Sequence, residues 1–156
     1  MNTSSNKSHK SFNLADITTY QSGVAQASAF RVVKHHTAHL LKDFGLSSMQ
    51  WFIIGTALDA GNEGIRLSDL ARKLDTTLAY MTNSVNLLES RGILIKKAHQ
   101  YDARTKLVSV SPTYKKTCSK IEEALRVRLR EVLYQNISRE ELTVYVQVLY
   151  KLSKMR

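Results

Sequence analysis

Short polar side chains recur over residues 77–86 at positions that would share one face of a helix. Asparagine can form a bidentate pair with adenine, and threonine can bond a base or a phosphate or touch a thymine methyl group. A helix face with these side chains suits the major groove of DNA, although helix-turn-helix units also serve as plain packing or protein-docking units. The face consists of Thr77, Leu78, Ala79, Thr82, Asn83 and Asn86.

A second group of candidate residues is cationic and surrounds Asp102 and Arg104. A solvated hairpin needs no such cluster, whereas a hairpin laid along DNA needs cations for the phosphates and an arginine for the narrow minor groove. Asp102 can orient the Arg104 guanidinium, the alternative being a surface ion pair that contributes little. The flanking cations are Lys96, Lys97 and Lys106.

Two other possible functions, metal binding and redox sensing, have weaker support in the sequence. His35 and His39 have the i,i+4 spacing that can chelate a metal, with His36 beside them, but no carboxylate or thiolate accompanies them, and we expect no metal site. Cys118 would sense oxidants only if it were exposed and its pKa were lowered, and a lone helical cysteine more often packs in a core. No Ser/His/Asp constellation, glycine-rich phosphate loop or His-Glu metal motif occurs. We therefore expect neither an enzyme nor a cofactor.

The candidate DNA-contacting side chains need elements to position them. The pattern predicts a helix over 67–74 with Ser68 as its cap, a turn over 75–77 and a helix over 78–92. Strands over 93–99 and 106–110 would form a hairpin around a polar turn at 100–105. Helix, turn, helix and hairpin in this order make a winged helix. Its expected core is the small residue Ala71 at the helix crossing together with Leu70, Leu74, Met81, Val85 and Leu88.

Apolar stripes flank this unit on both sides. The first lies on one long helix from Leu14 to Asp43, ended by Gly45, and a buried helix capped by Ser47 or Ser48 follows. Downstream, Ser111-Pro112 predicts the start of a helix that runs to about residue 135, and Ser138 with Glu141 forms the capping box of a last helix. The stripes over 14–43 and 113–154 are too long for a winged helix of this size to cover. We therefore expect them to pair across a two-fold axis.

Composition favours nucleic acid as the partner. The 156 residues carry 23 Lys+Arg against 13 Asp+Glu, a net charge of +10, and 43% of them are hydrophobic. The charge is uneven, at −2 over 47–65, +4 over 66–106 and +3 over 107–131. One cysteine, no apolar run of membrane-spanning length and a polar N-terminus without a signal-peptide core predict a cytoplasmic protein.

A family resemblance is carried by four stretches: GLSSMQWFII, LSDLARKLDTT, TNSVNLLESRGIL and DARTKLVSVSP. Through them residues 46–118 resemble the MarR family of bacterial and archaeal winged-helix transcription regulators, and with the flanking helices the likeness extends over about residues 14–154. The resemblance implies a homodimer, assigns DNA recognition to Thr77, Tyr80, Thr82 and Asn83, and assigns wing roles to Asp102 and Arg104. The family usually has arginine where Asn83 stands, so the base preference is not carried over. It usually has glycine where Tyr114 stands, so the geometry at the start of the helix after the wing is not carried over either.

The sequence thus predicts an α+β, mostly helical, winged helix-turn-helix with long N- and C-terminal dimerisation helices. We expect a disordered tail at 1–12, a dimerisation helix at 13–45, a DNA-binding domain at 46–111 and dimerisation helices at 112–156. The expected function is that of a homodimeric repressor on a pseudo-palindromic operator; the alternative is a protein-interaction module without specific DNA binding. The expected DNA contacts also include Asn86, Lys97 and Lys106. A small aromatic or lipophilic effector is a further expected partner, for which Trp51, Tyr20 and Tyr80 are candidate pocket residues.

Overall fold

A computed structural model describes residues 13–99 and 102–155 of the chain. The predicted tail at 1–12 and the hairpin tip at 100–101 lie outside these residues. The elements in chain order are a 3₁₀ helix, η1 (Leu14–Asp16), and then α1 (Thr19–Lys42), α2 (Ser48–Asp59), β1 (Ile65–Arg66), α3 (Leu67–Lys73), α4 (Leu78–Ser90), β2 (Leu94–His99), β3 (Asp102–Val110), α5 (Lys115–Val132) and α6 (Arg139–Ser153).

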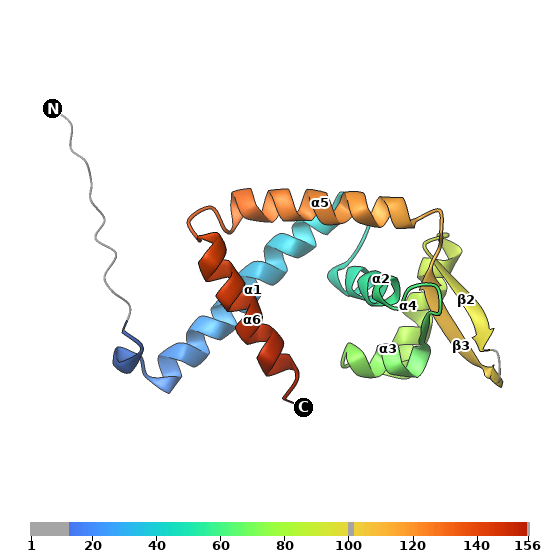
Figure 1. The fold of residues 1–156 in the computed structure, drawn as a ribbon, viewed down its shortest axis with the longest axis horizontal. Helices are drawn as coiled ribbons and strands as arrows, with labels where there is room; N and C mark the ends of the chain where they lie inside the picture. Colours follow the sequence, from blue (N-terminus) through green and yellow to red (C-terminus); the bar gives the residue numbers. More distant parts are fainter. Residues whose placement is uncertain (1–12, 100–101, 156) are drawn as a thin grey trace.

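These elements form two lobes that α5 connects (Figure 1). One lobe contains α2, α3, α4 and the sheet. In the other, α6 crosses α1 and the two helices line a common groove, with the N-terminal end of α1 far from the winged-helix lobe. The C-terminal part of α1 contacts α5 and α2. The helices α1 and α5 therefore take part in both lobes.

The first long helix is shorter than its apolar stripe predicts. Thr18 caps it through a capping box: its Oγ1 accepts the Gln21 N–H at 3.1 Å and Gln21 Oε1 accepts the Thr18 N–H at 3.0 Å. The helix therefore begins at Thr19, and the prediction of one helix from Leu14 is wrong because the cap separates off a 3₁₀ turn. Gly45 ends it as predicted, with φ of +65°.

The helix-turn-helix forms where the sequence predicts it. Thr77 caps α4, its Oγ1 accepting the Tyr80 N–H at 3.1 Å, and Gly92 follows the helix end with φ of +70°. The predicted cap Ser68 is wrong, because α3 already begins at Leu67 and its N-cap position is Arg66, which makes no side-chain cap bond. Asp75 occupies the turn in a left-handed conformation with φ of +53°.

The sheet is larger than the predicted hairpin. Its strand order is β1-β3-β2, and all the strands are antiparallel. The short strand β1 was not predicted, because two residues are too few to show the alternation of apolar and polar side chains that marks a strand. β3 begins at Asp102, so the prediction of a turn through 105 is wrong for 102–105. Cross-strand pairing overrides the polar composition of that segment. The β2–β3 register shifts between Ala98 and His99.

The last two helices differ in how well their caps were predicted. Ser138 and Glu141 form the predicted capping box of α6. Ser111-Pro112 does not start α5: the Tyr114 N–H donates to the Ser111 carbonyl at 2.9 Å, which makes 111–114 a turn with proline at its second position. The helix begins only at Lys115, and it ends at Val132 rather than near 135.

The buried core lies almost entirely in the winged-helix lobe. Leu70, Ala71, Met81, Val85 and Leu88 are buried as predicted, and Leu74 is partly buried against them. The core continues through the first half of α5 and reaches α1 only at Leu41, while α6 has no buried residue. Within one chain, the apolar side chains of α6 and of most of α1 are therefore left uncovered.

Candidate nucleic-acid interface

The helix α4 presents one face to the core and the other to solvent. Its core face contains Met81, Val85 and Leu88, all with 0% exposure. The predicted binding positions Thr77, Tyr80, Asn83 and Asn86 are exposed, together with Leu78 and Ala79, whereas Thr82 is half-buried. The structure thus brings the predicted polar residues of this helix together on one accessible surface, hereafter the α4 face.

Some hydroxyls of the α4 face also serve the helix itself. Thr77 Oγ1 accepts the backbone N–H of Tyr80, and the Thr82 hydroxyl donates to the Leu78 carbonyl at 2.8 Å. The Thr82 hydroxyl proton is therefore engaged, and its oxygen is left as an acceptor. Asn83 lies one position further on and is exposed.

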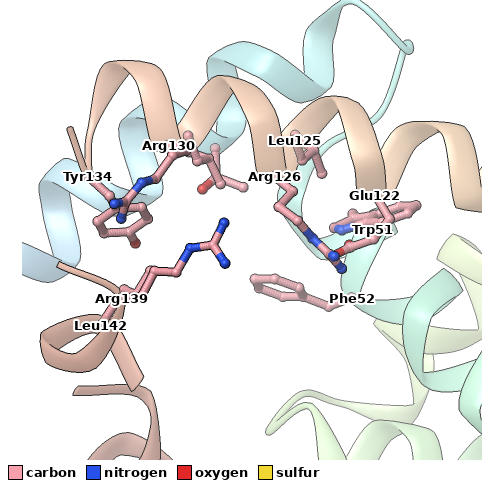
Figure 2. Close-up of a pocket in the computed structure, with 11 residues that line it drawn as sticks. Trp51, Phe52, Glu122, Leu125, Arg126, Arg130, Tyr134, Arg139 and Leu142 are labelled. Carbon is pink, nitrogen blue, oxygen red and sulfur yellow. The ribbon is translucent and has the colours of Figure 1, made fainter. Parts of the chain in front are cut away.

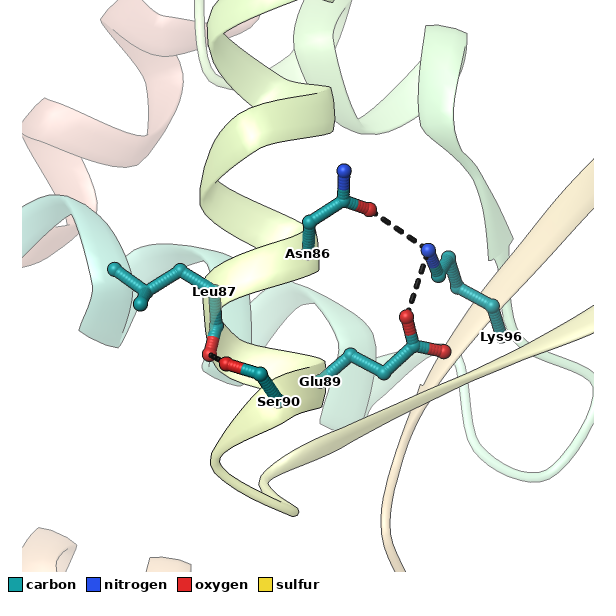
Figure 3. Close-up of polar contacts among 5 residues, drawn as sticks. All are labelled: Asn86, Leu87, Glu89, Ser90 and Lys96. Atoms are coloured by element: carbon teal, nitrogen blue, oxygen red, sulfur yellow. Dashed lines mark hydrogen bonds and ion pairs between the residues drawn. The ribbon is translucent and has the colours of Figure 1, made fainter.

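Asn86 takes part in a polar network that joins α4 to the wing (Figure 3). Lys96 Nζ, on β2, lies 2.7 Å from Asn86 Oδ1 and 2.7 Å from Glu89 Oε2. The contacts of Lys96 with Asn86 and Glu89 were not predicted. Lys96 follows Asn86 by ten residues and Glu89 by seven, and it reaches them only because β2 folds back along α4.

The wing places the remaining predicted cations beside this helix. Lys97 and Lys106 are exposed, and they lie on neighbouring strands, with Lys97 paired with Leu107 and Ala98 paired with Lys106. Asp102 and Arg104 lie at the start of β3, close to the hairpin tip. Their side chains lie outside the described part of the structure, so the pairing of Asp102 with Arg104 stays a prediction.

A cavity of about 550 Å³ lies between the two lobes (Figure 2). Aromatic side chains line it from α2 and the α5–α6 connection, namely Trp51, Phe52 and Tyr134, and arginines reach it from α5 and α6. Figure 2 shows the Arg139 guanidinium directed into the space between Tyr134 and Phe52. The other lining residues are Thr37, Glu122, Leu125, Arg126, Leu129, Arg130 and Leu142.

The electrostatics of this cavity favour an anion. Arg126 is paired with Glu122 at 3.5 Å, but Nη1 of Arg130 is buried without a hydrogen-bond partner in the described part of the chain. Burial, with a smaller contribution from Tyr145, raises the pKa of Tyr134, which keeps its phenol protonated as a donor. The cavity arginines were not predicted, although Arg126 and Arg130 have the i,i+4 spacing that places both on one helix face.

Of the three aromatic candidates for a pocket, only Trp51 lies at this cavity. Tyr20 is 78% exposed near the start of α1, and Tyr80 is on the α4 face. The structure therefore does not bring these three residues together. Tyr80 is instead placed with the candidate DNA contacts.

The alternative chemistries gain no support. Cys118 is 1% exposed and burial raises the pKa of its thiol, the opposite of what a redox sensor requires. His35 and His36 contact edge to face at 5.6 Å, and among the described residues no group of three or more potential ligands could hold a metal ion. No described helix is long and apolar enough to span a membrane.

The similarity of this chain to known proteins is found in its structure and not in its sequence. No protein-family model and no curated protein sequence matches the chain. Apo MarR from E. coli superposes with a TM-score of 0.72 at 17% identity, over 83% of this chain and 94% of that one. A MarR family regulator from Rhodococcus sp. superposes with a TM-score of 0.79 at 13% identity, over 90% and 98%.

A third similar structure contains DNA. CouR, a transcriptional repressor known from Rhodococcus jostii and solved on a 23-mer duplex, superposes with a TM-score of 0.74 at 18% identity, over 85% of this chain and 92% of that one. The similarity covers both lobes, so the predicted architecture is confirmed at the level of fold. This chain has the winged-helix fold of the MarR family transcriptional regulators.

Proposed function

We propose that this protein is a cytoplasmic, sequence-specific regulator of transcription that binds double-stranded DNA as a homodimer and represses by occupying a pseudo-palindromic operator. The carrying observation is the exposed, polar α4 face directly beside a wing that presents Lys97 and Lys106. A helix of this kind reads base edges while a basic hairpin contacts phosphates. The DNA-bound structure of CouR, which has the same fold, supports the assignment.

Each element then has its own share of the contacts. We assign base and backbone recognition on α4 to Thr77, Tyr80, Thr82, Asn83 and Asn86. The wing contacts phosphates and the minor groove through Lys97, Arg104 and Lys106, and Asp102 orients the Arg104 guanidinium. Residues 46–111 form the DNA-binding domain, and 13–45 with 112–156 form the dimerisation part.

Uncovered apolar surface supports the homodimer. On α6, Val144 is 58% exposed and Tyr150 is 64% exposed, and on α1 Phe30 is 66% exposed. A groove between these helices adds further apolar surface around Val33, Tyr145 and Leu149. Exposed apolar patches of this extent mark interaction surfaces, and a two-fold pairing would present two α4 faces to successive turns of one DNA groove.

Binding measurements test the proposal directly. The protein is titrated by fluorescence anisotropy onto the duplex from upstream of its own coding sequence and onto a scrambled duplex, at several salt concentrations. We expect tighter binding to the upstream duplex, with affinity falling steeply as salt rises. Equal, weak affinity for both duplexes would contradict the proposal and favour the protein-interaction module.

We further propose that the interlobe cavity takes a small aromatic effector with an anionic group. Trp51, Phe52 and Tyr134 offer aromatic walls, and Arg130 and Arg139 offer the counter-charge. Structures of the same fold contain such compounds: NadR is solved with 4-hydroxyphenylacetate and CouR with p-coumaroyl-CoA. An effector between the lobes would alter the separation of the two α4 helices in a dimer and so the affinity for DNA.

Trp51 is the chain's one tryptophan and lies at the cavity, so its fluorescence reports occupancy. We expect 4-hydroxyphenylacetate to change this fluorescence and the matching amide to change it much less. Arg139→Gln should weaken the binding of the acid and leave the binding of the amide unchanged. Arg72→Gln is the control, since Arg72 is exposed and pairs only locally with Asp69. Equal responses to acid and amide would contradict the charge assignment.

A further inference from the structure

The network of Asn86, Lys96 and Glu89 fixes the orientation of one side chain on the α4 face. Lys96 bridges the other two at 2.7 Å each, and its side chain is only 25% exposed. Glu89 is 38% exposed and contacts the same ammonium from a position three residues further along α4. The lysine is thus kept in place by a carboxylate and in turn contacts an amide that faces solvent.

The chemistry of the ammonium determines which end of the amide it meets. A lysine ammonium has three donors and no acceptor, so the atom beside it must be the amide oxygen and not the amide nitrogen. Figure 3 shows Oδ1 of Asn86 turned toward Lys96 and the amide nitrogen turned away from it. The two N–H donors of Nδ2 therefore face away from the lysine and are the outward-facing end of Asn86.

This constraint changes what Asn86 can read. The adenine pair of an asparagine needs Oδ1 to accept from the adenine amino group while Nδ2 donates to N7. Lys96 occupies one lone pair of Oδ1 and holds the N–H donors of Nδ2 outward. Guanine N7 and O6, adenine N7 and thymine O4 all accept from such donors, whereas cytosine shows only an amino donor in the major groove.

Resting on the proposed function, we propose that Asn86 reads DNA as a donor and selects against cytosine, the base that shows no acceptor in the major groove, and that Lys96 is the positioning residue that imposes this choice. Lys96 itself is not a phosphate contact, because Glu89 already neutralises it. Lys97 is the contrast: the adjacent lysine is exposed and provides charge from the same strand.

Selection of binding sites from a random duplex library tests the inference even though the operator sequence is not specified in advance. We expect the wild-type protein to enrich one site, with a position where cytosine is depleted by roughly three- to tenfold relative to the other bases. Asn86→Ala identifies that position by abolishing its preference. Asn86→Asp keeps a partner for Lys96 but replaces donors with acceptors, so we expect the preference to move to adenine or cytosine.

Lys96→Met and Lys97→Met form the matched pair that isolates positioning from charge. Lys96→Met releases the amide so that Oδ1 can also turn outward, and we expect cytosine to become acceptable at the Asn86 position. Lys97→Met is expected to lower affinity for all sequences and to leave that preference unchanged. Thermal unfolding of each variant verifies that it folds, and Asn86→Asp provides the test if Lys96→Met does not.

The outcomes separate the inference from the function on which it depends. A wild-type protein that enriches no sequence would overturn the proposed function and the inference with it. Enrichment of a site at which Asn86→Asp and Lys96→Met leave every base preference unchanged would overturn the inference alone.

Discussion

Asn83 and Arg104 represent two different tasks on the proposed DNA surface, one on the α4 face and one at the start of β3. Asn83 is exposed on the helix, where side chains meet base edges. Asn83→Ala should therefore cost about 1–3 kcal/mol on the selected site and much less on random DNA. Binding titrations on both duplexes measure the difference.

Arg104→Ala should instead weaken binding to every sequence and flatten the salt dependence, because a cation at the hairpin end meets phosphate or the minor groove. Asp102→Ala should have a weaker effect of the same kind, since the cation remains while its orienting partner is lost. Titrations at several salt concentrations provide the slope. If Arg104→Ala affected only the selected site while Asn83→Ala lowered both affinities equally, the two roles would have been exchanged.

Cys118 is expected to react slowly with a thiol reagent in the native protein, because it is 1% exposed and burial raises the pKa of its thiol. Ser119→Cys in a Cys118→Ala background is the control, since residue 119 is exposed on the same helix. Labelling should be fast in the control and slow in the wild type. Equal rates would show that the α5 packing opens readily.

The same burial predicts a pH dependence of stability. A thiol whose pKa is raised above its ordinary value of 9.0 stays neutral in the folded protein while the unfolded chain ionises. The free energy of unfolding should therefore be unaffected below that value and fall as pH rises above it. Tyr114, whose pKa burial raises from 10.0, adds to the same trend. Denaturant titrations at neutral and alkaline pH check the sign.

At the scale of elements, the junction of β1 with β3 depends on a close approach at Gly64. This residue has φ of +79°, and a Cβ atom there would lie 2.9 Å from the Val108 carbonyl oxygen. Gly61 has a similar φ of +64° but nothing within 4 Å of its Cβ position. The pair therefore separates backbone strain from steric contact.

Gly61→Ala should cost about 1–2 kcal/mol of stability from the left-handed backbone alone. Gly64→Ala should cost roughly 1–3 kcal/mol more, because a backbone carbonyl has to move. Denaturant unfolding of both variants gives the comparison. Equal losses would mean that β1 shifts away from β3 at little cost.

At the scale of the whole molecule, the chain buries one lobe and leaves the other uncovered. The α6 residues Thr143, Gln147 and Lys151 form a polar stripe at four-residue spacing, while Leu149 is 46% exposed among other apolar side chains. In the proposed dimer, Leu149→Glu would place a carboxylate in an apolar interface. Sedimentation should show dimers for the wild type at micromolar concentration and monomers for Leu149→Glu.

Gln147→Glu is the matched control, because it adds the same charge on the polar stripe of the same helix. It should stay dimeric. A wild-type protein that sediments as a stable monomer would overturn the dimer and with it the proposed two-fold binding to DNA.

Local patterns determined much of this architecture. The capping box at Ser138 and the glycines after two helices fix helix ends through bonds between near neighbours, so short sequence windows suffice to predict them. For α2 the sequence left Ser47 or Ser48 open as the cap, and the structure has Ser47; α4 is capped by Thr77. The buried face of α4 followed from helical spacing, and that spacing also identified its exposed polar side. The order of the elements in the winged helix followed from the same local patterns, and the MarR resemblance agreed with it.

Tertiary structure decided whatever depends on segments distant in the chain. β1 exists because β3 pairs with it, and β3 extends to Asp102 because pairing with β2 outweighs local polarity. The cavity arginines converge from α5 and α6 only when the two helices pack, and Lys96 meets Asn86 only when β2 folds along α4. Sequence could therefore indicate which residues are able to contact DNA. The orientation of the Asn86 amide depends on a contact between two elements, and only the folded chain supplies it.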